Sequence, residues 1–259
     1  VGVGHSKGNS VDLKIAFAGT YPVVYGIDTP QGVIYSNDTA KVEIKDFCAE
    51  FVSDDNWVYL TGGADNSKTW IPDDGNYGMK QGFYSCFSPD ATFDSMTHDD
   101  GLNNWYAKDL TWWQPSNSDV GVTSDDLAQT MTFDLKGGAN LTVTDAKGNA
   151  TAGVFTFDPD AHALNAEGVE FAHGAWADGK SKSFSKDFYV FHLGENQLMI
   201  ANLRDPALSG EGACWFVWNF VSKEYADAYK ASHGSTQTEP ELIDNWRAYV
   251  EPLTQHEMT

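Results

Sequence analysis

Aromatic side chains are concentrated between residues 57 and 115, where they alternate with glycine, aspartate and asparagine. A pyranose ring can stack its apolar C–H face on an aromatic ring while its hydroxyl groups bond to short polar side chains. Rigid rings beside a few convergent polar groups are typical of small-ligand sites. This composition therefore predicts a site that binds sugars. The candidate stacking residues are Trp105, Trp112, Trp113, Trp70, Tyr77 and, outside the stretch, Trp176. The candidate hydroxyl partners are Asp73, Asn76 and Asn104.

Trp105, Trp112 and Trp113 are expected to include the main stacking platform, because they lie in polar segments that cannot all belong to a core. Neighbouring side chains of an extended chain point to opposite faces. One of Trp112 and Trp113 is therefore expected in the core and the other at the surface. Trp57 and Tyr59 are expected to be packing residues.

Acidic side chains number 37, so close carboxylate pairs of the kind that a glycoside hydrolase needs will occur by chance. The chain lacks the E-x-D-x-x-E strand motif of the jelly-roll laminarinase-like hydrolases, the G-x-S-x-G elbow and the HExxH helix. We therefore predict no catalytic residue and a non-catalytic, carbohydrate-binding function. Two alternatives stay open: a glycoside hydrolase or other carbohydrate-active enzyme on the same scaffold, and a ligand-free structural or adhesion spacer.

Two short acidic clusters, at residues 73–76 and 98–101, carry oxygen ligands of the kind that calcium prefers. Neither has the spacing of an EF-hand loop, so solvated turns are favoured, no cofactor is predicted, and a structural calcium ion stays open. The cysteines Cys48, Cys86 and Cys214 are far apart and form no C-x-x-C pair, which supports neither a zinc site nor a disulfide framework. At most one disulfide can form, and buried reduced thiols are the expected state.

The 37 acidic and 16 basic residues give a net charge of −21. Such a surface repels the phosphates of nucleic acids and is compatible with a neutral polysaccharide or oligosaccharide as partner. No stretch approaches the roughly 18 apolar residues of a membrane span, and no signal-like segment opens the chain. Any export signal is therefore expected to have been removed. A monomer is expected.

Short alternating apolar segments, separated by glycine, asparagine and aspartate turns, predict an all-β protein. Residues 1–47 contain four predicted strands, at 11–17, 21–27, 33–35 and 39–44, which indicate a partial immunoglobulin-like unit. Residues 48–222 are predicted to form one jelly-roll-like antiparallel β-sandwich. Residues 223–259 are predicted to be a helical tail packed on the sandwich, with short helices near 223–229 and 238–250.

The segment AGTYPVVYGIDTPQGVIYSNDTAKVEI resembles the closing strands of a PKD-type domain, a β-sandwich spacer of extracellular and surface proteins. The segments WVYLTGGADNSKTWIPDDGNYGMKQG, LTWWQP, GVFTFDPDAHALNAEG and VWNFVSKEYAD are similar to a domain of surface lipoproteins from glycan-scavenging Bacteroidetes. This second resemblance spans most of residues 55–227. It implies an extracellular glycan-binding protein at the outer-membrane surface, associated with a starch-utilisation-like import system and held by a lipid anchor on a removed N-terminus. The loop at 85–104 departs from the family pattern because it is longer and more acidic.

Overall fold

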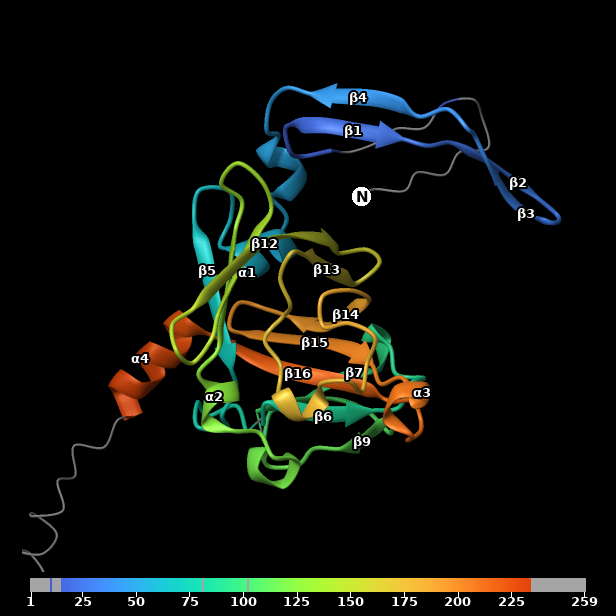
Figure 1. The fold of residues 1–259 in the computed structure, drawn as a ribbon. Helices are drawn as coiled ribbons and strands as arrows, with labels where there is room; N and C mark the ends of the chain where they lie inside the picture. The colour runs from blue at the N-terminus through green and yellow to red at the C-terminus, as the bar shows by residue number, and fades with distance from the viewer. Residues whose placement is uncertain (1–9, 11–14, 81, 102, 234–259) are drawn as a thin grey trace, which may run out of the picture.

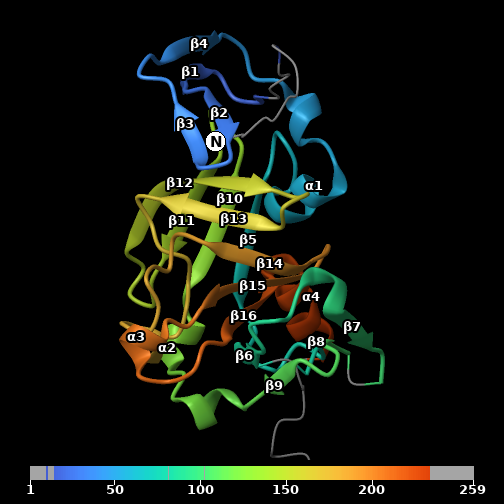
Figure 2. The same cartoon turned by 90° about the vertical axis from the view of Figure 1, so that its right-hand side faces the viewer.

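Eight antiparallel strands close into a barrel in the computed structural model (Figures 1 and 2). The structure describes residues 10, 15–80, 82–101 and 103–233. The barrel strands are β5 (Ser67–Pro72), β10 (Thr130–Asp134), β11 (Asn140–Thr144), β12 (Ala150–Asp158), β13 (Ala163–Glu167), β14 (Phe188–Leu193), β15 (Gln197–Leu203) and β16 (Trp215–Ser222). Each strand pairs with the next one in this order. The barrel closes because β16 pairs with β5 as well as with β15.

The prediction of an all-β, antiparallel fold is confirmed, but the prediction of a jelly-roll sandwich for residues 48–222 is wrong. A jelly roll consists of two packed sheets joined by Greek-key connections. In this protein the barrel strands follow one another up and down around a single closed sheet. Both arrangements bury one face of each strand, so the alternation of apolar and polar residues cannot distinguish between them.

Large apolar side chains fill the barrel. In β10, Met131 and Phe133 are buried, while the three residues that alternate with them are partly exposed. The largest fully buried side chains of the same cluster are Trp70, Trp218, Phe83, Phe133, Phe171, Phe216 and Phe220. The interior of an eight-stranded barrel is just wide enough for side chains to fill it.

Tight turns rich in glycine, asparagine and aspartate join the barrel hairpins, at 136–138 and 145–149. Asp145 accepts hydrogen bonds from the backbone N–H groups of Lys147 and Asn149, both at 2.8 Å. Gly148 has a φ of 83°, which is the left-handed region that favours glycine. This local chemistry sets the register of β11 and β12.

Between β5 and β10 the chain leaves the barrel. This excursion contains β6 (Tyr84–Phe87), η2 (Phe93–Ser95), β7 (Met96–Asp99), β8 (Asn104–Ala107), β9 (Thr111–Trp113), η3 (Asn117–Val120) and α2 (Ser124–Leu127). Strand β6 pairs with the first half of β16, and β9 pairs with β6 at the edge of the sheet. The hairpin β7–β8 contributes to a second apolar cluster, in which Ala107 and Trp105 join Phe191, Met199 and Val217 of the barrel.

The other helical segments are η1 (Ala49–Val52), α1 (Asp55–Thr61), η4 (Ala175–Ala177), α3 (Pro206–Ser209) and α4 (Lys223–His233). Helix α1 was not predicted. Asp54 is its N-cap, and Asp54 Oδ1 accepts hydrogen bonds from the backbone N–H groups of Asn56 and Trp57. The helix buries Trp57, as expected. Helix α4 confirms the helix predicted near 223–229, and its Tyr225 Oη donates to the Tyr77 carbonyl at 3.0 Å. The helix predicted at 238–250 lies outside the described residues. None of the described helices is long and apolar enough to cross a membrane.

The N-terminal segment forms an arm beside the barrel (Figure 1). Its strands are β1 (Gly19–Val23), β2 (Gly26–Thr29), β3 (Gly32–Tyr35) and β4 (Ala40–Ile44), paired as β1–β4 and β2–β3. Three of the four predicted strands overlap these elements. Of the strand predicted at 11–17, residues 15–17 are not in a strand and residues 11–14 lie outside the described residues.

Candidate functional site

Two consecutive tryptophans are the most exposed aromatic side chains of the excursion. Trp112 and Trp113 are 56% and 50% exposed and lie on β9, which pairs on one side with β6. The prediction that one of them belongs to the core is wrong. Because β9 is an edge strand of three residues, both of its faces remain open to solvent, so both rings offer a flat apolar face to a ligand.

A polar hollow of about 280 Å³ begins directly after these tryptophans. Its lining consists of Asp74, Gly75, Lys80, Gly82, Gln114, Pro115, Ser116 and Asn117. Amide, hydroxyl, carboxylate and ammonium groups are therefore present in the lining of this hollow. Four of the lining residues, at 114–117, follow Trp113 directly in the chain. The other half of the lining comes from the loop after β5, which contains the predicted polar segment 73–76.

Asn104 acts indirectly on this hollow. It is buried, and its Nδ2 donates to Gln114 Oε1 at 3.2 Å. Gln114 Nε2 in turn donates to Asn104 Oδ1 at 3.4 Å. The reciprocal amide pair holds Gln114 at the rim, so Asn104 positions a lining residue and was wrongly predicted to meet sugar hydroxyls itself. Asn76 is exposed, and its backbone N–H donates to Asp74 Oδ1 at 2.9 Å, which fixes the turn beside the hollow.

Asp73 lies behind this turn and is 1% exposed. Its Oδ1 accepts from the backbone N–H of Gly75 at 2.9 Å, whereas Oδ2 has no partner among the described residues. Burial raises the pKa of Asp73 to about 7. The residue opposite it on β16 is Asn219, whose backbone carbonyl accepts from Asp73 N at 2.9 Å and whose Oδ1 is also buried without a partner.

Tyr84 connects Trp113 to Trp176. The ring of Tyr84 meets Trp113 edge-on with 6.5 Å between centroids, and it meets Trp176 edge-on at 4.8 Å. Trp176 lies in η4 and is partly buried, with Lys180 Nζ 4.7 Å from its ring centroid. The predicted residues Trp113 and Trp176 are thus joined through Tyr84, although Lys180 occupies one face of Trp176.

Three other predicted stacking residues belong to the packed parts of the protein. Trp70 is fully buried and donates from Nε1 to the Leu60 carbonyl at 3.0 Å, and Tyr77 is 3% exposed under α4. Trp105 is partly buried and stacks on His192 with 4.1 Å between ring centroids. The prediction that Trp70 and Tyr77 contribute stacking surfaces is wrong, because the barrel and α4 cover them.

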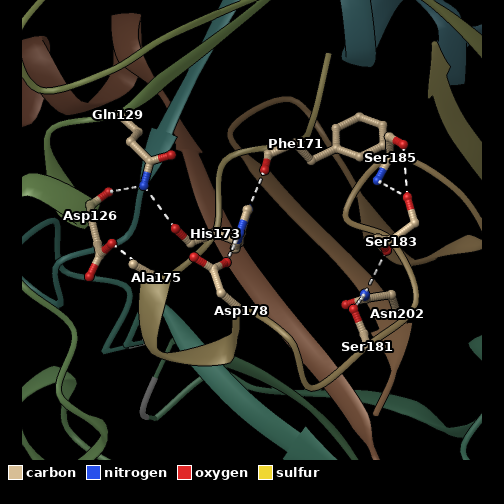
Figure 3. A network of polar contacts seen from close by, with 10 residues as sticks. All are labelled: Asp126, Gln129, Phe171, His173, Ala175, Asp178, Ser181, Ser183, Ser185 and Asn202. Atoms are coloured by element: carbon tan, nitrogen blue, oxygen red, sulfur yellow. Dashed lines mark hydrogen bonds and ion pairs between the residues drawn. The ribbon is translucent and has the colours of Figure 1, made fainter. Parts of the chain in front are cut away.

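Sequence reasoning missed a second hollow, of about 520 Å³, which lies beside the long connection between β13 and β14. Figure 3 shows the polar network next to it. His173 contacts the Phe171 carbonyl through Nδ1 at 2.7 Å and Asp178 Oδ1 through Nε2 at 2.8 Å. Gln129 Nε2 donates to the His173 carbonyl at 2.8 Å. These groups already bond to one another, and the rings of His173 and Phe184 stack face to face at 3.7 Å. The network holds the connection in place and leaves this hollow without an open aromatic face.

Two acidic turns were considered as calcium sites. In both of them, carboxylate oxygens accept hydrogen bonds from backbone N–H groups of the same turn. Asp73 accepts from Gly75 N, Asp74 from Asn76 N and Asp99 from Gly101 N. In the part of the chain that the structure describes, no group of three or more histidine, cysteine, aspartate or glutamate side chains is arranged to hold a metal ion. No protein-family model matches this chain, and a search of curated proteins found no significant match.

Proposed function

We propose that this protein binds a neutral polysaccharide or oligosaccharide on the Trp112–Trp113 surface, with the adjacent hollow receiving the sugar hydroxyls. The observation that carries the proposal is that two half-exposed tryptophans lie on an edge strand that leads directly, in the chain, into four residues lining a polar hollow of about 280 Å³. An apolar ring face with convergent polar groups is the arrangement that a pyranose requires. The protein is not an enzyme in this proposal, and its place is the outer surface of a cell, attached there by a lipid anchor.

The electrostatics of the hollow favour an uncharged ligand. Asp74 and Lys80 place opposite charges in its lining, and the net charge of −21 repels polyanions. The rim also carries the Asn104–Gln114 amide pair, whose fixed orientation reduces the entropy lost on binding.

The test is affinity electrophoresis against a panel of neutral polysaccharides, with the release of reducing sugar assayed in parallel. Retardation without release is expected. By analogy with the stacking of bases on aromatic side chains, Trp112→Ala and Trp113→Ala should each lose about 1–3 kcal/mol of binding free energy, or roughly ten-fold or more in affinity.

Tyr35→Ala is the matched control, because Tyr35 is an aromatic side chain with 66% exposure on the distant arm. It should leave affinity unchanged. Affinity that survives in the Trp112→Ala/Trp113→Ala double variant would refute this site. Release of reducing sugar would favour a carbohydrate-active enzyme, and neither retardation nor release would favour a spacer.

A further inference from the structure

The N-terminal arm has a strand edge that the rest of the described chain leaves unpaired. Among the described residues, β4 pairs with β1 alone, in a sheet of two strands. Figures 1 and 2 show β4 on the side of β1 that faces away from the barrel. A two-stranded ribbon is marginally stable in water, and three or more strands with an apolar face are needed for independent stability. The outer edge of β4 is therefore a place where another strand can be added.

A proline determines which edge of this ribbon is open. Pro22 of β1 lies opposite Lys41 of β4. Proline has no N–H, so in a strand its nitrogen faces away from the neighbouring strand. Opposed residues of an antiparallel ladder alternate between pairs that exchange both hydrogen bonds and pairs that exchange none. Pro22 and Lys41 therefore form a pair of the second kind. Pro22 interrupts the outer edge of β1, whereas Lys41 and Glu43 direct their backbone N–H and C=O groups out of the open edge of β4.

The sequence of β4 is complementary to itself. If two copies of β4 lie antiparallel about Val42, Lys41 of each copy faces Glu43 of the other, and Ala40 faces Ile44. Lys41 and Glu43 are exposed, and neither forms an ion pair with another described residue. Opposite charges that face each other across an antiparallel pair stabilise it. The pairing therefore brings together two lysine–glutamate pairs and hydrogen-bonds the backbone groups of the open edge.

The same pairing extends an apolar face. Side chains alternate between the two faces of a strand, so Val42 and the residue opposite it, Tyr21, share a face. Val42 is 37% exposed. In the paired sheet it meets Val42 of the second copy at the position where antiparallel side chains approach most closely. The residues of the apolar face are Tyr21, Val23, Ala40, Val42 and Ile44.

We propose that two copies of this chain associate through β4, forming a two-fold symmetric sheet in the order β1–β4–β4–β1. A lysine on an edge strand ordinarily prevents such pairing. Here Glu43, two residues after Lys41, supplies its partner in the second copy. The contact uses both open edges, so association stops at the dimer. A five-residue strand pair is smaller than a standard interface, so the dimer should dissociate on dilution. The inference rests on the arm alone and is independent of glycan binding.

Sedimentation velocity over a wide range of protein concentration tests the proposal, at about 0.15 M salt, where the net charges of −21 are screened beyond about 8 Å. The mass should rise from 28.4 kDa towards twice that value as the concentration increases. Lys41→Glu and Glu43→Lys each place like charges opposite one another twice, so each should weaken the dimer by about ten-fold or more. Lys147→Glu is the matched control, because it changes the net charge equally at an exposed barrel turn and should leave the dimer unchanged.

Two rescues test the register. The double variant Lys41→Glu/Glu43→Lys is again complementary to itself and should recover the dimer. An equimolar mixture of the two single variants should form a heterodimer about as stable as the wild-type dimer. Recovery would also show that the single variants lose charge complementarity and not their fold. A wild-type protein that stays monomeric up to its solubility limit would overturn the proposal. A dimer that the single variants leave intact, or that neither rescue restores, would overturn it as well.

Discussion

Replacing Asp73 by asparagine should remove most of one pH-dependent contribution to stability. The pKa of this carboxyl rises from 3.8 to about 7 on folding, because the side chain is buried. Between these two values the folded protein holds a proton that the unfolded chain has released. Stability therefore falls as the pH rises from about 4 to about 7, and this contribution is constant above that range. At 1.36 kcal/mol per pKa unit, the free energy of unfolding decreases by about 4 kcal/mol over this interval.

Asp73→Asn carries no titrating group and keeps the size and shape of the protonated carboxyl, so it lacks the pH-dependent contribution of Asp73. The variant and the wild type should have similar stability at pH 4. At pH 8 the variant should be more stable, by up to about 4 kcal/mol. Urea unfolding at several pH values, followed by tryptophan fluorescence, measures the difference.

Asp160→Asn provides the matched control, because Asp160 is exposed and its removal should leave the pH profile parallel to that of the wild type. The wild type and both variants share the remaining acidic residues. Comparing the two variants therefore isolates the contribution of Asp73 to the pH dependence of stability. Identical pH profiles for wild type and Asp73→Asn would refute the reasoning, since they would mean that Asp73 ionises in the folded protein without cost.

His192 should act in the opposite direction. Burial and the neighbouring His98 lower its pKa from 6.5 to about 4, so the unfolded chain binds the proton first and stability falls by up to about 3 kcal/mol as the pH drops through this range. The same urea titrations on His192→Leu should lack that loss. Trp105→Ala should lower the free energy of unfolding by about 2–4 kcal/mol, because the ring packs on the outer face of the barrel and stacks on His192, yet it should leave glycan affinity unchanged. A large loss of affinity in a folded Trp105→Ala variant would return that residue to the binding surface.

Several features could be predicted from local sequence because local chemistry decides them. The strands β10 and β11 follow from alternating apolar residues, and the turn at 145–149 follows from an aspartate that bonds its own backbone and a glycine with positive φ. Helix α4 follows from its sequence in the same way. The exposure of at least one ring of the Trp112–Trp113 pair could also be predicted, because the surrounding residues are too polar for a core.

Contacts between distant residues decided the rest. Whether strands form a sandwich or a barrel depends on which edges pair, and the closing pair β5–β16 joins segments more than 140 residues apart. Trp70 and Tyr77 have the same local composition around them as Trp112, but the barrel and α4 cover the former two.

The amino-acid sequence by itself determined the β class, many of the strands, and which aromatic and polar side chains are available for a binding site. Only the tertiary structure decided which rings remain exposed and that Asn104 holds Gln114 at the hollow. The physical reason is that strand periodicity depends on neighbours in the chain, whereas burial and contact depend on the strands and helices that pack against each residue.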